Sequence, residues 1–449
     1  MALQATTSKA VEPAIFEVGI HERMPVAQLA MLGLQNIFGM TGMLVFPGLL
    51  GRSFNLPPEQ IAYLYGMTFA TCGLITILQS VLLLRLPIVQ GPYAGSFAAL
   101  LVVGHLQSGG LGAAYGSLLV ASLIYAVLAL PIRGRSLIGP LARLLNAPLI
   151  SGLLVMLIMT QVANIALPNW IGLPISPGFP ALNIGAGALG VAVLIAVSLW
   201  GGRIRRAAIL IGLAAGTLCY ALVKPISLAA VASAPLLVVP RLFPFGFAVQ
   251  PDLVIIFLLV LIPPAIGSMA LYHVVAEWGQ EPLPSGRVAQ GIFAVALGSI
   301  VVGLVGGFST IVYPDNVGML RTTRVGSRYA TLAAGILLIV LGGWVKFDML
   351  LVIVPLPVLS ALATLLFGIV FMHGVHMLAK VDWDDRKFIV AGLAMLVGLG
   401  GMFIAPATLQ AMPLWVRLFL QQPVISGGLT LVILYAVLCA REMTGAAKT

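Results

Sequence analysis

The sequence predicts an all-α polytopic membrane protein with fourteen transmembrane segments, arranged as two inverted repeats of seven, with short β-strands in the broken segments 3 and 10. Of the 449 residues, 60% are hydrophobic and only 8% are charged. Water-soluble domains carry roughly a quarter charged residues, and apolar runs of about 18 or more residues are typical of membrane-spanning helices. This composition therefore indicates a chain that lies largely within a lipid bilayer, and it argues against a soluble enzyme.

Apolar segments recur along the whole chain in two series. The first comprises Val26–Leu50, Gln60–Leu84, Ser96–Leu106, Leu111–Leu130, Ala147–Leu167, Ile184–Trp200 and Ala207–Pro225. After the proline-rich connector 227–251, the second comprises Leu253–Trp278, Val288–Gly306, Asp315–Arg324, Ala330–Trp344, Leu351–Leu378, Phe388–Leu409 and Val424–Ala440. Because seven is odd, the second series must cross the membrane in the sense opposite to the first.

The third and tenth segments are both short and broken by glycine and proline. Ser309–Tyr313 is rich in β-branched and aromatic residues, which favour extended backbone, and Pro314 fits the first position of a helix. We predict that Ala94–Phe97 and Ser309–Tyr313 are extended and adjacent near the middle of the membrane, each leading into a half-helix. Matching interruptions in two halves are typical of a transporter whose substrate site lies at the repeat interface.

Basic residues separate by side of the membrane when both termini are placed in the cytoplasm. Eighteen of the 23 Lys and Arg residues then lie on the cytoplasmic side, as membrane topology favours. The others, Arg52, Lys224, Arg241, Lys346 and Arg417, lie outside. The net charge of +10 is therefore attributed to cytoplasmic loops, and no basic run interleaved with aromatics indicates nucleic-acid binding. We expect an inner-membrane protein with both termini cytoplasmic.

The same assignment leaves Asp315 as the only acid at membrane depth. An unpaired carboxylate there is costly, so it normally faces a cavity, a partner or a substrate, or is held protonated. We predict that Asp315 contacts the substrate and takes part in proton coupling. The alternative is that it only caps its own helix. The three cysteines show no metal-type spacing, so neither a metal nor a cofactor is expected.

Polar and helix-breaking residues in two other segments are further site candidates. Asn36, beside Gln35, can line a site or tie helices together. Pro264, within Pro263-Pro264, must kink the eighth segment. With Gly267 and Ser268 beside it, this kink forms either a wall of the site or a packing feature.

Several motifs together resemble the nucleobase-ascorbate transporter family (NAT/NCS2), which includes bacterial uracil and xanthine permeases. They are Leu34-Gln35-Asn36, Leu86–Gly91 followed by Ser96-Phe97-Ala98, Tyr313–Gly318 followed by Thr323-Arg324-Val325, and Val354–Val358. The resemblance covers 24–440. It implies substrate contacts from Gln35, Asn36, Tyr93, Ala94, Gly95, Ser96, Phe97, Pro264, Gly267, Ser268, Tyr313, Pro314, Asp315 and Asn316.

The resemblance also implies a division into core and gate. The core is expected to comprise 25–130 and 229–347, and the gate 131–228 and 348–440, between cytoplasmic tails 1–24 and 441–449. A homodimer through the gate is expected. The chain departs from the family pattern at Asp315, where Glu or Gln is usual, at Pro264, where close relatives carry Glu, and at Asn36, where His is usual. Two or three extra residues lie around 92–95.

Two functions remain open at this point. The first is proton-coupled uptake of a nucleobase or related planar heterocycle of the uracil, xanthine or urate type, with sodium as the alternative ion. The second is an organic-anion symporter or exchanger, because facing helix N-termini favour negative charge. The Asp315-Asn316-x-Gly318 pattern favours the nucleobase, and Arg321 favours the anion. No second catalytic polar group is predicted at depth, so a membrane enzyme is not expected.

Overall fold

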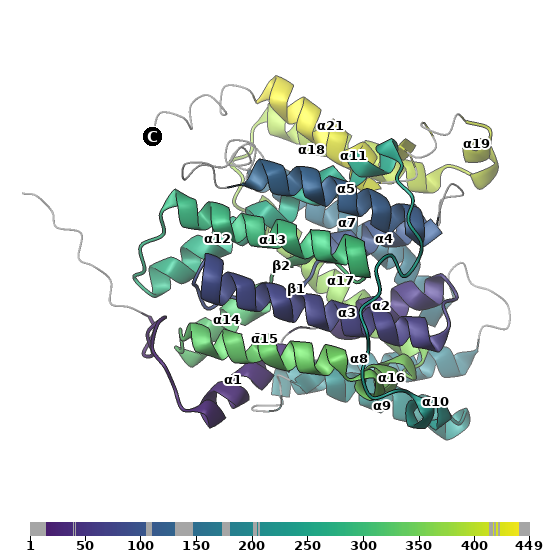
Figure 1. The fold of residues 1–449 in the computed structure, drawn as a ribbon. Helices are drawn as coiled ribbons and strands as arrows, with labels where there is room; N and C mark the ends of the chain where they lie inside the picture. Colours follow the sequence, from purple (N-terminus) through teal and green to yellow (C-terminus); the bar gives the residue numbers. More distant parts are fainter. Residues whose placement is uncertain are drawn as a thin grey trace, which may run out of the picture.

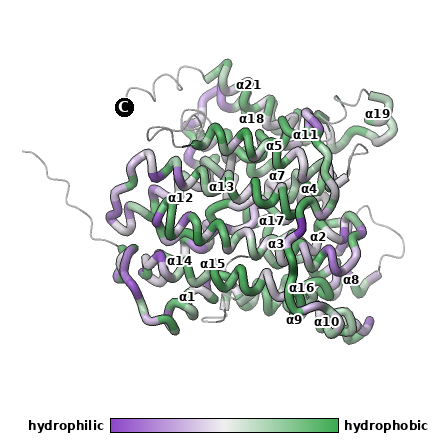
Figure 2. Tube along the Cα trace, viewed as in Figure 1, coloured by the Kyte–Doolittle hydropathy of each residue, from purple (hydrophilic) through white to green (hydrophobic). Residues whose placement is uncertain are grey.

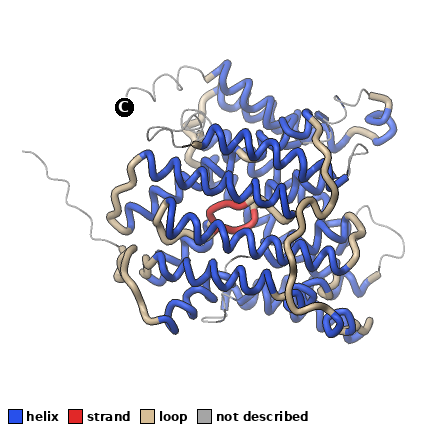
Figure 3. The backbone as a smooth tube through the Cα atoms, viewed as in Figure 1, coloured by secondary structure: helices blue, strands red, loops and turns tan. Residues whose placement is uncertain are grey.

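The computed structural model describes residues 15–38, 40, 42–104, 110–130, 147–172, 180–200, 204, 207–412, 416, 419–420 and 423–439. These residues form a mostly helical protein in which a small strand pair lies among the helices (Figures 1 and 3). Hydrophobic residues run along the helices, while hydrophilic residues gather at the turns that join them (Figure 2). In the described part of the chain, seven helices are long and apolar enough to cross a membrane. The prediction of a multi-span membrane protein is confirmed.

The elements of the first half are, in order, α1 Val26–Phe38, α2 Gly42–Ser53, α3 Pro58–Ile77, the π-helix η1 Leu78–Leu83, β1 Gln90–Pro92, α4 Ala94–Gly104, α5 Gly110–Ala129, α7 Pro148–Ile171, α8 Ala181–Trp200, α9 Ala208–Val223 and α10 Ala229–Ser233. The second half continues with α11 Pro251–Val260, α12 Ile262–Trp278, α13 Ser285–Val305, β2 Thr310–Val312, α14 Pro314–Thr323, α15 Arg328–Gly343, α16 Val345–Val352, α17 Leu356–Leu378, α18 Asp385–Gly400, η3 Gly401–Phe403, α19 Pro406–Gln410 and α21 Pro423–Leu438.

The strand pair joins the two halves of the chain. β1 and β2 are antiparallel, with Gln90 opposite Val312 and Pro92 opposite Thr310. The prediction of extended backbone within Ser309–Tyr313 is confirmed. The prediction for Ala94–Phe97 was wrong, because α4 already begins at Ala94 and the strand lies four residues earlier. The Gly and Pro residues that suggested extension here allow the turn out of β1, and the helix then starts at once.

Three predicted continuous segments are broken in the structure. The first divides between α1 and α2, and the eighth divides at Leu261, where α11 ends and α12 begins with Pro263 in its first turn. The predicted kink at the proline pair is thus confirmed. The twelfth begins only at Leu356, because Pro355 ends the irregular turn that follows α16. Proline lacks a backbone donor and starts a helix more readily than it continues one.

Close helix packing rests on paired glycines. A Cβ on Gly73 of α3 would lie 2.5 Å from the carbonyl oxygen of Gly335 on α15, and α7 and α17 approach in the same way at Gly152 and Gly374. Small residues let helix backbones approach closely inside a membrane, where packing rather than the hydrophobic effect joins helices. These two contacts are among the most extensive helix pairs of the molecule.

The segment before α1 is anchored to the opposite half of the chain. Val18 forms a parallel bridge with Val325, and the Gly326 nitrogen donates to the Val18 oxygen over 2.9 Å. Glu17 pairs with Arg324 over 2.9 Å. Residues 15–22 therefore fasten the ends of α12 and α14 and the start of α15 to one another.

Candidate functional site

Both half-helices begin beside the strand pair and run away from it. The Tyr93 nitrogen, just before α4, donates to the Ser309 oxygen over 2.7 Å, and the Tyr313 nitrogen, just before α14, donates to the Val89 oxygen over 3.1 Å. These bonds extend the two strands to the first turn of each helix. The positive ends of both helix dipoles, with their free backbone N–H groups, therefore lie next to the strands.

Two tyrosine rings cover two glycines at the strand pair. A Cβ on Gly91 would lie 2.1 Å from Cδ2 of Tyr313, and a Cβ on Gly95 would lie 2.3 Å from Cζ of Tyr93. Only glycine therefore leaves room for these rings. Each tyrosine is 9% exposed.

Helices α1 and α12 bring polar groups to β2 and α14. The Asn316 side-chain nitrogen donates to Oδ1 of Asn36 over 3.0 Å and to its backbone oxygen over 3.1 Å. The Gln35 amide contacts the Met319 sulfur at 3.8 Å. From α12, the hydroxyl of Ser268 accepts from the Val312 nitrogen over 3.4 Å. The structure therefore brings α1, α12, β2 and α14, which all carry predicted site residues, together at one strand pair.

The remaining predicted residues divide between the strand pair and the core. Pro264 is buried, and a Cβ on Gly267 would lie 3.9 Å from Cδ1 of Ile311 in β2. The Ser96 hydroxyl donates to the Tyr93 oxygen over 2.9 Å, which ties the first turn of α4. Phe97 is fully buried and stacks on Phe46 with ring centroids 4.8 Å apart.

Asp315 is the second residue of α14, one position after Pro314, so its backbone lies at the helix start as predicted. Its side chain lies outside the described residues. The proposed contact between Asp315 and a substrate therefore stays a prediction.

A sequence profile of the Permease family matches residues 27–407 of this chain. The chain belongs to the xanthine/uracil permease family. It is thus a transporter and not an enzyme. Its relatives include two uric acid permeases of Bacillus subtilis (strain 168), PucJ and PucK, which are both 28% identical to it. The match to PucJ covers 92% of each chain. The match to PucK covers 95% of this chain and 99% of the relative. Xanthine permease XanP of Escherichia coli (strain K12) is 25% identical over 92% of this chain and 93% of its own.

Two solved structures share the fold of this permease. The transmembrane domain of the cyanobacterial bicarbonate transporter BicA aligns with a TM-score of 0.57 at 12% identity, covering 93% of this chain and 99% of that one. The murine anion transporter Slc26a9, in its inward-facing state, aligns with a TM-score of 0.62 at 11% identity, covering 93% and 69%.

Sequence reasoning missed Gln90 as a site residue of the permease. Its side chain donates to Oε1 of Gln79, and its backbone nitrogen donates to Oγ1 of Thr76 over 2.9 Å. Gln79 in turn donates to the Gly291 oxygen over 3.2 Å. The visible signal was a glutamine directly before Gly-Pro in an apolar segment. Gln90 thereby links the strand pair to η1 and α13.

Several buried oxygen atoms at the strand pair have no hydrogen-bond partner among the described residues. They are Oε1 of Gln90, Oγ of Ser309, Oγ1 of Thr310 and Oδ1 of Asn316. Unpaired buried polar atoms are rare in proteins, and they concentrate at sites that bind other molecules. Their clustering marks the strand pair as the candidate substrate site of the permease.

The prediction that Asp315 is the only acid away from loops and segment ends was wrong. Asp348 is 1% exposed, and neither of its carboxyl oxygens has a hydrogen-bond partner in the described part of the chain. It lies on α16, a separate short helix that packs against α3. The sequence placed it in a loop because Lys346 and a segment boundary lie close by.

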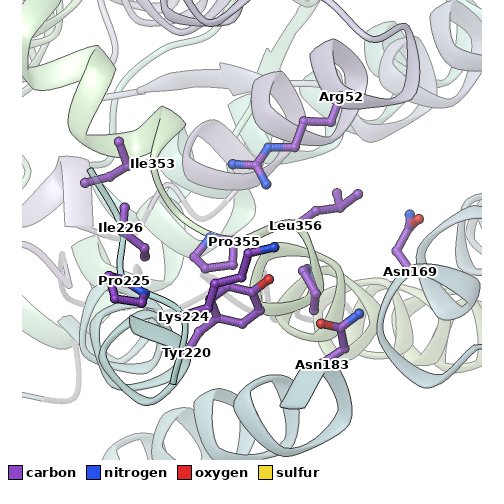
Figure 4. A pocket seen from close by; sticks show the side chains of 11 residues that line it. Arg52, Asn169, Asn183, Tyr220, Lys224, Pro225, Ile226, Ile353, Pro355 and Leu356 are labelled. Carbon is purple, nitrogen blue, oxygen red and sulfur yellow. The ribbon is translucent and has the colours of Figure 1, made fainter. Parts of the chain in front are cut away.

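Two cavities of the permease have linings that include no residue of the strand pair. One, of about 360 Å³, is lined by Arg52, Lys224 and the turn before α17 (Figure 4). The other, of about 330 Å³, is lined by His21, Arg85, Glu281 and Arg287.

Proposed function

We propose that this permease is a secondary active transporter that carries a purine-type nucleobase, of the urate or xanthine class, into the cell in symport with protons. The observation that carries the proposal is the strand pair, where two half-helix N-termini and a cluster of unpartnered oxygens converge. The printed names of the relatives, uric acid and xanthine permeases, supply the substrate class. An antiparallel pair of short strands between half-helices is a site geometry suited to alternating access.

A planar purine presents N–H donors and carbonyl acceptors along its edges. At the strand pair, Gln90, Asn316 and Ser268 offer side-chain groups of both kinds, and the half-helix N-termini offer N–H donors to a carbonyl oxygen or a negative charge. Pro264 stands where close relatives carry Glu. Recognition is therefore proposed to depend on Asp315 together with amides, hydroxyls and backbone groups, without a second acid at Pro264.

We further propose fourteen segments in two inverted repeats, with the core in 25–130 and 229–347 and the gate in 131–228 and 348–440. The division is supported by packing: α2, α3, α12 and α13 contact the strands, while α7, α8, α9, α17, α18 and α21 pack mainly on one another. Both termini would lie in the cytoplasm of an inner-membrane protein, and the gate would form a homodimer.

Asp315 is proposed to carry, or help carry, the coupling proton. Burial favours the neutral carboxyl, whereas the α14 N-terminus favours the charged one, so the two effects compete. A substrate N–H donor would favour the ionised form, and an anionic substrate the protonated form. Either way, proton and substrate binding are linked.

An uptake assay tests the proposal. The permease is produced in a host strain that lacks its own purine and pyrimidine permeases, and accumulation of radiolabelled urate, xanthine, uracil and benzoate is measured with and without a protonophore. We expect accumulation of urate or xanthine that the protonophore abolishes. Accumulation of benzoate alone would replace the nucleobase with an organic anion, and accumulation that follows a sodium gradient would replace the proton.

A further inference from the structure

The cavity next to Arg52 is lined by both polar and apolar side chains. It lies between the end of α2, α7, α8, the end of α9 and the turn from α16 into α17. Two cations line it, Arg52 and Lys224, together with the amides of Asn169 and Asn183 and the phenol of Tyr220. Its described lining contains no Asp or Glu. Figure 4 shows Arg52 on one side and Lys224 with Tyr220 on the other, across proline and isoleucine side chains.

Arg52 keeps an uncompensated positive charge beside this cavity. Its Nη2 donates to the carbonyl oxygens of Val352, over 2.6 Å, and of Val354. Carbonyls orient a guanidinium but do not neutralise it, and no described carboxylate forms an ion pair with Arg52. Asp348 on the neighbouring helix is directed toward α3, where its Oδ2 lies 3.0 Å from the position of a Cβ on Gly66.

The apolar lining of the cavity fits the face of a flat ring. Pro225, Ile226, Ile353, Pro355 and Pro357 supply apolar surface beside the polar groups. An inorganic anion gains nothing from such a surface, whereas a planar organic anion buries apolar ring surface there while its charge meets the cations. The volume of about 360 Å³ lies within the range of roughly 300–1,000 Å³ that is typical of small-molecule sites.

The position of the cavity connects it to the strand pair. Arg52 ends α2, which also carries Phe46, and Pro355 starts α17, which carries Phe367. Both phenylalanines stack on Phe97 of α4, with ring centroids 4.8 and 6.3 Å apart. Helices α2 and α17, whose ends line the cavity, therefore both contact α4, the half-helix that follows β1.

We propose that this cavity is a capture site for a planar organic monoanion, represented by urate, which the permease holds before the anion reaches the strand pair. The inference rests on the proposed function for the identity of the cargo. Paired cations without a nearby acid raise the local concentration of an anion and speed its arrival. A neutral nucleobase gains nothing from them, so the site would favour the anionic member of a mixed substrate pool.

Kinetics of Lys224→Gln test the proposal, because Lys224 is exposed and its replacement leaves the packing of Arg52 intact. Initial uptake of urate and of neutral hypoxanthine is measured in intact cells. We expect the KM for urate to rise roughly tenfold, with the KM for hypoxanthine and both maximal rates unchanged. Lys224→Arg should restore the wild-type KM, and added salt should weaken the effect. Lys346→Gln is the matched control, since it removes a cation outside the cavity.

Two results would overturn the capture site: an unchanged KM for urate in Lys224→Gln, or an equal rise for urate and hypoxanthine. Equilibrium binding of radiolabelled urate to purified protein in phosphatidylcholine nanodiscs keeps the question separate from transport. If wild-type protein transports no purine but binds urate in a Lys224-dependent way, the proposed function fails and the capture site stands. Binding that is indifferent to Lys224 rejects the site whatever is transported.

Discussion

The two half-helix regions of this permease share one shape but differ in chemistry. Apart from Gln90 and Ser96, β1 and α4 consist of small and apolar residues around Tyr93, with no charged residue from 90 to 104. β2 and α14 carry Asp315, Asn316 and Arg321 within ten helical residues. The backbone that leads into each strand also differs. Gly306 and Gly307 lead into β2 with φ of 88° and 100°. Before β1, the Arg287 side chain donates a hydrogen bond to the backbone oxygen of Leu84.

This difference indicates a division of labour between the repeats. The first region provides a close-packed platform, because Gly91 and Gly95 accept tyrosine rings and Phe97 anchors α4 in an aromatic cluster. The second region contributes Asp315 and the amide of Asn316, and the first region adds the amide of Gln90. We therefore expect the first region to tolerate few changes in volume and the second to tolerate few changes in charge.

Filling Gly91 should have the largest effect. A valine there would overlap the Tyr313 ring, because even a Cβ would lie 2.1 Å from it. Overpacking of this kind costs about 1–3 kcal/mol, and here it also separates the strands. We expect Gly91→Val to lose uptake entirely and to unfold at lower temperature in a thermal-shift assay.

Gly392→Val is the control for Gly91→Val, since nothing lies within 4 Å of a Cβ at that glycine on α18. It should keep normal uptake and an unchanged or slightly higher thermal midpoint, because valine has a better helix propensity than glycine. Equal damage from the two variants would contradict the platform role of the first region.

Asp315→Asn should have the next largest effect. The change keeps the size of the side chain and its capping ability but removes its titration, so substrate binding should survive in part while accumulation against a gradient disappears. Accumulation and equilibrium exchange are compared in proteoliposomes across a range of pH.

Asp348→Asn is the matched variant, because it neutralises a buried acid on an element away from the strand pair. It should leave accumulation intact. If Asp315→Asn keeps undiminished pH-dependent accumulation and Asp348→Asn loses accumulation, the coupling proton would be assigned to Asp348 on α16 instead.

Separating Asn316 from Asn36 should have an intermediate effect. Asn316→Ala removes the donor of two hydrogen bonds to α1, each of which contributes about 1 kcal/mol. We expect a roughly tenfold loss of substrate affinity in Asn316→Ala. In a double-mutant cycle with Asn36→Ala, the losses should fail to add, because the two residues act through one contact. Fully additive losses would show that each residue binds separately.

Sequence patterns predicted the parts of this fold that depend on composition and chain breaks. The apolar segments, the break at Pro263-Pro264 and the strand before Pro314 all follow from local propensity. The strand before α4 was placed four residues too late, because register depends on pairing with β2 and not on the Gly-Pro signal alone. Asp348 and Gln90 were missed because tertiary packing sets their burial: Asp348 lies on α16, which packs against the distant α3, and Gln90 joins a hydrogen-bond network through Gln79 to α13.

The smallest effect is expected where the chain leaves η1 for β1. Arg287 donates to the Leu84 oxygen from Nη2 over 2.8 Å and from Nε over 3.1 Å, and its Nη1 meets Oε1 of Glu281 at 2.8 Å. His21 contacts the same carboxylate at 3.2 Å. Glu281 thus holds the arginine that fixes the turn into the first strand, whereas β2 relies on glycines.

Removing this carboxylate gives a pH-dependent prediction. Burial acts to raise the pKa of the Glu281 carboxyl, but Arg287 and His21 outweigh it and hold the pKa below its usual 4.5. Its contribution to stability is therefore fully present above pH 4.5 and is lost as the pH falls through the lowered pKa. The side chains of Arg287 and Glu281 are 21% and 20% exposed. Ion pairs that reach solvent contribute little to stability, so we expect Glu281→Gln to cost only about 0.5 kcal/mol. The difference in thermal midpoint between wild type and Glu281→Gln should disappear below pH 4.5 and become smaller in high salt. A difference that stays constant with pH would show that the substitution acts through packing instead.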